Sequence, residues 1–171
     1  MSAFRQKSVY LQTYLPAQSY KNICNGRINS VRKDKKPTNM SLQKLNFAIF
    51  GNIYQADKSA GIQQVLHSLK ERMAGVSMEK TFYDFLVKTR GLCLDGVSVF
   101  DGNYENADFV ISMGGDGTLL RSAYCVGDRC TPIIGVNMGR LGFLAGVSVE
   151  EIDEVLDNIY KEEYIVDCLA M

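Results

Sequence analysis

Hydrophobic residues recur along most of this chain in two spacings, one typical of buried strands and the other of helices. An apolar run from Leu45 to Ile53, interrupted at Gly51, has the length and composition of a parallel strand buried on both faces. In the segment that follows, the apolar residues at helical spacing are Ile62, Val65, Leu66, Leu69 and Met73. This pattern predicts a helix, with Ser59 able to cap its start and Gly75 able to end it.

The two spacings alternate through the rest of the sequence. Further strands are predicted over residues 76–78, 97–100, 108–113 and 132–136, and from Tyr164 onward. Further helices are predicted over residues 81–91 and 119–127, and after SVEE at residues 148–151, which has the form of a capping box. Their inward-facing residues are predicted to be Phe82, Phe85 and Leu86 in the first of these helices and Ile152, Val155, Leu156 and Ile159 in the last. Such alternation predicts an α/β fold, a parallel sheet flanked by helices, with binding loops at the carboxyl ends of the strands.

Charge divides the chain into two parts. Lysine plus arginine and aspartate plus glutamate number 19 each, so net charge gives no reason to expect a nucleic-acid partner. Before Leu45, however, nine basic residues accompany a single acidic one, Asp34. We therefore expect residues 1–44 to be a disordered basic tail or a start-site artefact, with translation beginning near Met40, and residues 45–171 to be the domain. A targeting peptide is a further alternative for the basic segment.

Apolar runs and cysteines limit the cellular setting. No apolar run approaches the roughly 20 residues that cross a bilayer, so we expect no membrane partner. The five cysteines include no CxxC pair, and His67 is the only histidine. This argues against a disulfide framework or a metal site built on cysteines, and it favours reduced cysteines in a cytoplasmic protein. His67 lies off the apolar stripe of its helix and is expected to be solvated.

The sequence GGDGT, residues 114–118, lies between a predicted buried strand and a helix, where bare backbone can approach a phosphate. It lacks the lysine of a P-loop, and Leu120 stands where a dinucleotide fingerprint has its third glycine. Asp116 would repel bare phosphate, so a sugar hydroxyl or a magnesium ion is its expected contact. Arg121, one turn along the helix, is expected to reach a phosphate. The structural alternative is that GGDGT is only a tight turn.

The motif GGDGT after an apolar strand resembles the signature shared by NAD kinases, diacylglycerol-type lipid kinases and phosphofructokinases. A second loop, NMGRLGFL at residues 137–144, resembles the companion motif of NAD kinases. The resemblance covers roughly Leu45 to Asp167 and implies a phosphofructokinase-like or NAD kinase-like N-terminal domain. It implies transfer of the terminal phosphoryl group of ATP to the ribose 2′-hydroxyl on the adenosine side of NAD, with a divalent metal, Mg²⁺. Polyphosphate in place of ATP and NADH in place of NAD are open alternatives.

The resemblance also implies roles for residues at the two loops. Asp116 would be the catalytic residue. The residues implied to bind the nucleotides are Gly115, Gly117, Thr118, Arg121, Asn137, Gly139 and Phe143. For Phe143, an equal alternative is that it anchors its loop in the core. Asn52, just after the first strand, is expected on the same binding edge.

Family members carry a second, mostly β-sheet domain with an Asn-Glu pair, and the resemblance implies that this C-terminal β domain is absent here. We therefore expect a chain truncated at the domain junction that, alone, binds nucleotide weakly and turns over poorly. Two other readings are an inactive nucleotide-binding fragment and a GGDGT kinase that acts on a lipid or sugar. Homo-oligomers are common in the full-length family.

Overall fold

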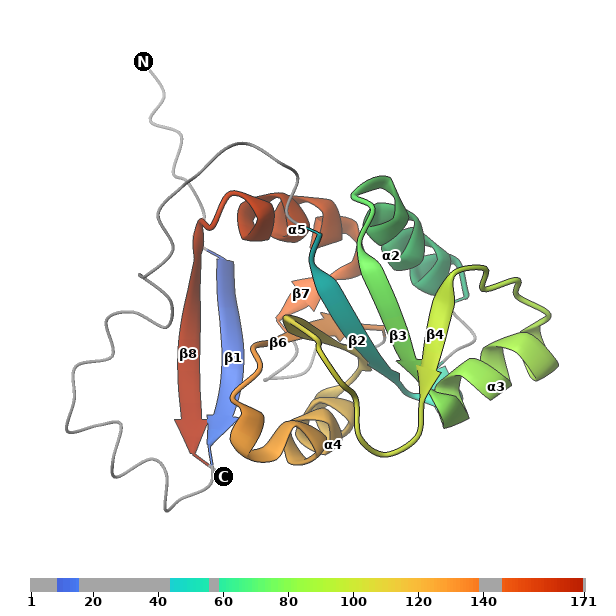
Figure 1. Ribbon diagram of the computed structural model, residues 1–171, viewed down its shortest axis with the longest axis horizontal. Coiled ribbons are helices and arrows are strands. Elements are labelled where there is room, and N and C mark those ends of the chain that lie inside the picture. Colours follow the sequence, from blue (N-terminus) through green and yellow to red (C-terminus); the bar gives the residue numbers. More distant parts are fainter. Residues whose placement is uncertain (1–8, 16–43, 56–58, 139–145, 171) are drawn as a thin grey trace.

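A computed structural model describes residues 9–15, 44–55, 59–138 and 146–170 of the chain. The elements are β1 (Val9–Leu15), β2 (Asn46–Gly51), α2 (Ser59–Glu71), β3 (Gly75–Glu79), α3 (Lys80–Arg90), β4 (Val97–Phe100), β5 (Phe109–Gly114), α4 (Asp116–Val126), β6 (Ile133–Asn137), β7 (Val147–Ser148), α5 (Ile152–Tyr160) and β8 (Tyr164–Ala170). From β2 onward, strands and helices alternate for most of the chain, as the periodicity predicts (Figure 1).

The strands form one sheet in the order β4-β3-β2-β5-β6-β1-β8, with β7 also paired to β6. Neighbours from β4 to β6 are parallel, as are β6 and β7, whereas β1 runs antiparallel to β6 and parallel to β8. The predicted α/β class, a parallel sheet flanked by helices, is confirmed.

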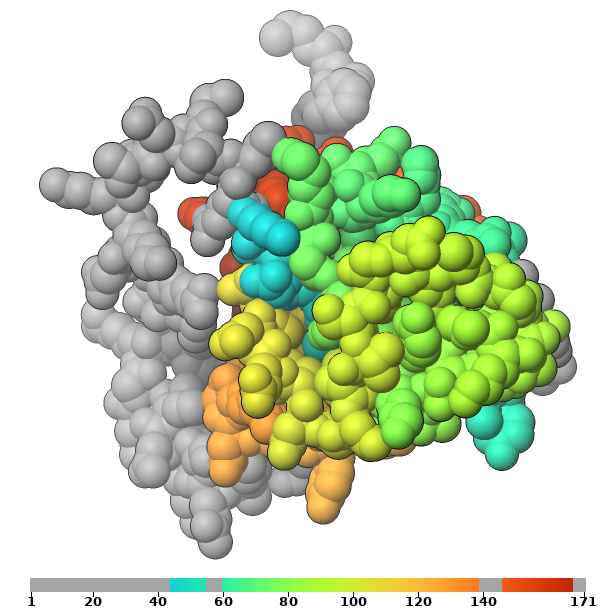
Figure 2. Space-filling view, turned by 45° about the vertical axis from the view of Figure 1, so that its right-hand side comes forward, coloured from blue at the N-terminus to red at the C-terminus, as the bar shows by residue number. Residues whose placement is uncertain are grey.

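Alternate residues of the central strands pack on opposite faces of the sheet. Phe47 and Ile49 of β2 join a large cluster that includes the buried faces of α2, α3 and α5. Ala48 and Phe50 join a smaller cluster with α4. Helices therefore cover both faces, which explains why these strands are apolar runs rather than alternating ones. On the outside, α3 and the segment leading to β5 form one continuous green-to-yellow surface (Figure 2).

Strand β1 lies within residues 1–44, for which the sequence analysis expected a tail. Its sequence, VYLQTYL, has no charged residue and is rich in aromatic and branched side chains, which favour strands. The charges were counted over the whole segment, so this short apolar stretch was not predicted as a strand. The rest of the expected tail, apart from Lys44, lies outside the described residues.

The ends of the helices can be compared with the capping residues that the sequence predicts. Gly91 ends α3 with φ 64°, as predicted, and the Ser148 N–H donates to the Glu151 carboxylate at 3.0 Å in the predicted capping box. The predicted end of α2 at Gly75 was wrong, since α2 ends at Glu71 and Gly75 begins β3. Met73 makes the reversal with φ 52°.

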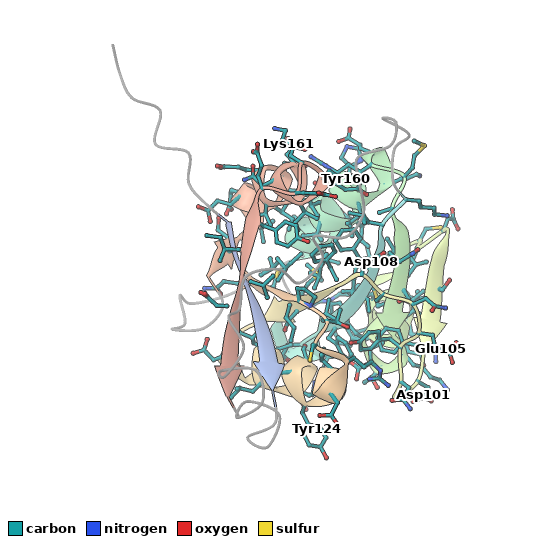
Figure 3. The ribbon with its side chains drawn as sticks, turned by 60° about the vertical axis from the view of Figure 1, so that its left-hand side comes forward. Asp101, Glu105, Asp108, Tyr124, Tyr160 and Lys161 are labelled. Carbon is teal, nitrogen blue, oxygen red and sulfur yellow. The ribbon has the colours of Figure 1, made fainter. Side chains whose placement is uncertain are left out.

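Two of the exposed side chains lie on helices α2 and α4. His67 is 71% exposed and lies 3.3 Å from Glu71, which confirms it as a solvated helix residue. Tyr124 on α4 is 81% exposed and projects away from the ribbon (Figure 3). Among the described residues, no helix combines the length and apolar character needed to span a membrane.

Candidate active site

The chain reverses its direction of travel across the sheet between β4 and β5. From β2 it moves outward through β3 to β4, then returns to the other side of β2 and continues through β5 to β6. The connections that leave the carboxyl ends of β2 and β5 therefore diverge, and such a switch point leaves a crevice. At this end of the two strands, the Asn52 N–H donates to the Met113 carbonyl at 3.1 Å.

A hollow of about 550 Å³ lies at this switch point. The residues that line it are Gly51, Asn52, Ile53, Tyr54, Glu79, Thr81, Gly115, Asp116, Gly117, Thr118 and Arg121. They come from the carboxyl ends of β2, β3 and β5 and from the first turns of α3 and α4. Five residues predicted for the site, Asp116 among them, thus lie together, and Asn52 lies with them on the expected edge.

In the GGDGT segment, Gly115 alone separates the strand from the helix. Strand β5 ends at Gly114, and α4 begins two residues later at Asp116. The N-cap, Gly115, is extended, and its carbonyl accepts from the N–H groups of Thr118 and Leu119 at 3.0 and 3.1 Å. Because a glycine N-cap has no side chain, the N-cap makes no side-chain hydrogen bond to α4, whose first residues line the hollow.

The glycines at this edge serve different purposes. A Cβ on Gly114 would lie 2.3 Å from Thr118 Oγ1, and one on Gly51 would lie 2.2 Å from the Phe82 ring. Both positions need glycine for packing. A Cβ on Gly117 would meet nothing within 4 Å. Packing within the described protein therefore gives no reason for glycine at position 117, and open space lies beside it on the wall of the hollow.

Asp116 is partly exposed and is the acidic residue of the first turn of α4. The dipole of the helix favours a carboxylate at this end. Its place on the wall of the hollow brings the carboxylate within reach of a ligand bound there.

Arg121 is engaged with protein groups, although we expected it to reach a phosphate. Its Nη1 and Nη2 donate to the two oxygens of Glu79 at 2.6 and 2.8 Å, and Nη2 also donates to the Gly51 carbonyl at 3.1 Å. Glu79 was not among the residues predicted for the site, although it lines the hollow. The available signal was its position just after the short predicted strand at residues 76–78, whose carboxyl end belongs to the same edge.

The second predicted loop starts beside the first. Asn137 ends β6 and is the register partner of Gly114, and the Met138 N–H donates to the Gly114 carbonyl at 3.2 Å. Asn137 does not line the hollow itself. Gly139 and Phe143, predicted to bind nucleotide, lie outside the described residues.

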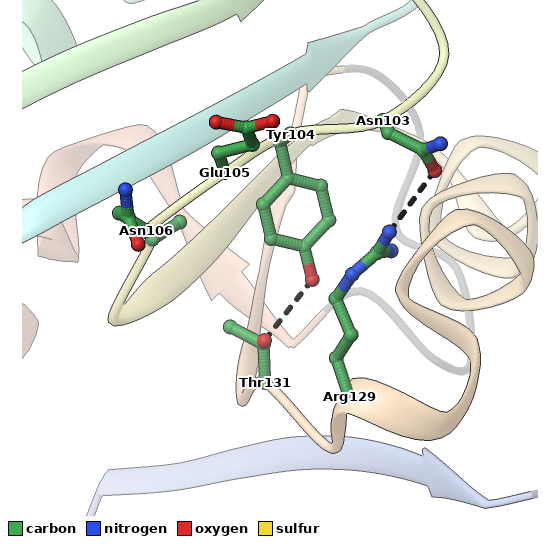
Figure 4. Close-up of a pocket in the computed structure, with 7 residues that line it drawn as sticks. Asn103, Tyr104, Glu105, Asn106, Arg129 and Thr131 are labelled. Atoms are coloured by element: carbon green, nitrogen blue, oxygen red, sulfur yellow. Dashed lines mark hydrogen bonds between the residues drawn. The ribbon is translucent and has the colours of Figure 1, made fainter.

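A separate hollow of about 380 Å³ lies between the loops that lead into β5 and β6 (Figure 4). Its polar groups bond to one another: the Tyr104 hydroxyl donates to Thr131 Oγ1 at 3.0 Å, and Arg129 donates to Asn103 at 3.0 Å. Burial raises the pKa of Tyr104 above its usual value, which keeps this hydroxyl a donor. Of the predicted site residues that the structure describes, none lines it.

Comparison with known proteins gives consistent matches. Residues 38–164 match the family described as ATP-NAD kinase N-terminal domain. An "NAD kinase" of Bacteroides fragilis is 43% identical over 123 residues, which cover 72% of this chain and 42% of that protein. An "NAD kinase" of Porphyromonas gingivalis is 34% identical over 124 residues, which cover 72% and 43%. This chain thus spans about two fifths of the length of the curated relatives it matches.

A solved structure resembles the fold. A yeast NADH kinase crystallised with NADH matches with a TM-score of 0.58 and 16% identity, over 70% of this chain and 39% of the yeast chain. At this identity the likeness supports the arrangement of strands and helices, and residue roles have to come from the hollow itself.

Proposed function

This chain belongs to the ATP-NAD kinase family, and we propose that it transfers the terminal phosphoryl group of ATP to the ribose 2′-hydroxyl on the adenosine side of NAD, giving NADP. The observation that carries the proposal is the place of Asp116. Its carboxylate lines a hollow at the switch point of the sheet, beside a helix start and a glycine that faces open space. A hydroxyl acceptor and a phosphate donor can meet there.

In the proposed reaction the ribose 2′-oxygen bonds to the terminal phosphorus of ATP. The bond from that phosphorus to the oxygen bridging it to the next phosphate breaks, and ADP leaves. Asp116 accepts the proton of the 2′-hydroxyl and orients this oxygen for attack. Because such transfers have a loose transition state, orientation contributes more than basicity. The open face at Gly117 lets the nucleotide approach the first amides of α4.

A divalent ion, Mg²⁺, is part of the proposal. No group of three or more histidine, cysteine, aspartate or glutamate side chains in the described ranges can hold a metal. Magnesium is often bound by one or two carboxylates together with substrate phosphates, and Asp116 at the hollow fits this arrangement. When bound, the ion would offset the negative charge of the phosphates.

NAD and ATP are the proposed partners, and the cytoplasm is the proposed location. In the described part of the chain, Cys93, Cys125 and Cys130 are free thiols. Thiols persist in reducing compartments, which supports this location.

The function is tested by measuring NADP formation from ATP, Mg²⁺ and NAD with an NADP-specific dehydrogenase. Because relatives are more than twice as long as the matched region, two proteins are assayed: the 171-residue chain, and its residues 1–167 continued by the remainder of the B. fragilis relative. NADP from either supports the proposal. If neither forms NADP while the B. fragilis protein does, the proposal is refuted. Parallel assays with a diacylglycerol and a sugar phosphate as acceptors test the alternative that the chain is a GGDGT kinase acting on a lipid or sugar.

Replacing Gly117 by alanine should weaken nucleotide binding without harming the fold. The new methyl group meets open space in the protein, and alanine is the better helix residue, so stability should stay equal or rise by up to about 1 kcal/mol. A methyl group where a ligand needs contact costs about 1–3 kcal/mol, or roughly 5- to 150-fold in affinity. Calorimetric titration with ATP and thermal unfolding measure the two effects.

The matched control for this variant is Gly146→Ala. A Cβ there also meets nothing within 4 Å, and Gly146 does not line the hollow. The control should bind ATP like the wild type. Equal affinities for the wild type and the Gly117→Ala variant would mean that no ligand approaches the helix at this point.

A further inference from the structure

Glu79 is the last residue of β3 and the N-cap of α3, yet its side chain makes no cap hydrogen bond to its own helix. Both carboxylate oxygens instead accept from Arg121 on α4. The Glu79 side chain is 16% exposed and that of Arg121 is 43% exposed, so the carboxylate is the more enclosed partner. Glu79 is therefore directed across the hollow rather than at its own helix.

Arg121 follows Gly117 by one helical turn, on the same side of α4. Helical side chains lean toward the N-terminal end of their helix, which here is the end that carries Asp116. The Arg121 guanidinium is thus near the ligand position, but Glu79 occupies two of its donors as a bidentate pair. A third contact joins Nη2 to the Gly51 carbonyl at 3.1 Å, at the end of β2. Bidentate pairs are the stronger and more directional kind of ion pair.

The pairing determines the charge that a ligand meets. Among the described residues that line the hollow, Asp116, Glu79 and Arg121 are charged at neutral pH, which gives a formal sum of one negative charge. A free guanidinium would attract phosphate, whereas a guanidinium already neutralised by a carboxylate attracts it weakly. The wall of the hollow that Glu79 and Arg121 form therefore favours hydroxyl groups over phosphate.

We propose that Glu79 is a specificity-determining residue that withholds Arg121 from phosphate, so that this wall of the hollow takes an uncharged sugar of the substrate. The identification of that sugar as the ribose of NAD rests on the proposed function. The withholding of Arg121 rests on the ion pair alone.

The proposal is tested by titrating the 171-residue chain with inorganic pyrophosphate at low ionic strength, in a calorimeter. The variants are Glu79→Gln, Arg121→Met and the double variant. Glu79→Gln should bind pyrophosphate about tenfold more tightly than the wild type, since it frees a guanidinium for charge-assisted hydrogen bonds. Arg121→Met leaves the Glu79 carboxylate unpaired and should bind pyrophosphate more weakly, whereas the double variant keeps the net charge of the wild type and should bind like the wild type. Glu154→Gln removes one exposed carboxylate that does not line the hollow and controls for net charge.

Two results would overturn the proposal. One is an unchanged affinity in Glu79→Gln, or a gain that persists without Arg121. The other is a double variant that binds pyrophosphate more weakly than the wild type, which would show that the wild-type guanidinium already binds phosphate. This second comparison decides the question even if Glu79→Gln does not fold. Pyrophosphate binding involves no turnover, so a failure to form NADP would refute the proposed function and leave this result standing.

Discussion

Replacing Asp116 by asparagine is expected to slow NADP formation by about 10²- to 10⁴-fold, the usual contribution of a positioned proton acceptor. Asparagine keeps the shape of the side chain, but as a neutral amide it can neither accept the proton of the hydroxyl nor orient that hydroxyl with the strong hydrogen bond that a carboxylate accepts. The residue is partly exposed at a helix start, so the protein should remain folded. The rate is measured in whichever protein forms NADP, the chain or its extended version, and the fold is checked by circular dichroism.

The control is Asp128→Asn, which changes an exposed aspartate just after α4 that does not line the hollow. It should keep the wild-type rate. If Asp116→Asn retained more than about a tenth of the activity, Asp116 could not be a positioned proton acceptor. A fall in KM without a fall in the rate constant would likewise contradict the role assigned here.

Replacing Phe82 by alanine should give the largest loss of stability, about 3–5 kcal/mol. The ring is fully buried and fills the space beside Gly51 at the end of β2. Its removal opens a cavity directly beneath the candidate active site. Small domains are stable by only about 5–15 kcal/mol, so much of the margin would disappear. Urea unfolding followed by circular dichroism measures the change.

Phe85→Ala is the matched control, because it makes the same substitution one turn away on α3 at a partly buried position. Its loss should be clearly smaller. Equal losses in the two variants would show that the Phe82 ring has no special place beside Gly51.

Local patterns in the sequence predicted most of what positions the site. Apolar periodicity fixes a helix or strand within a few residues, and GGDGT combines its glycines with a strand on one side and a helix on the other. The place of Gly117 in the first turn of α4 follows from the same stretch of chain. These features depend on neighbours in sequence, which is why one sequence suffices to predict them.

Features that depend on strand order were not predictable in this way. Glu79 meets Arg121 because β3 and β5 both flank β2, and the order of strands is not written in either segment. Gly75 is glycine because the side chain of Asn46 leaves no room for a Cβ there, so this glycine does not mark the end of α2, and the reversal falls at Met73. Strand β1 pairs with segments far along the chain, and local composition gave no sign of them.

The pairing of β1 has a consequence for the order in which the molecule assembles during translation. Val9 pairs with Tyr164, and the whole ladder of β1 with β8 is parallel, so β1 pairs with a strand that leaves the ribosome after all the strands of the hollow. The bridge between β1 and β6 joins Gln12 and Ile133, and this single pair does little to stabilise β1 before β8 is made. Contacts this distant carry a large loop-closure entropy. The strands that build the hollow, β2 to β6, are therefore made and can pair before β8 is available, and β1 is fixed in the sheet after them.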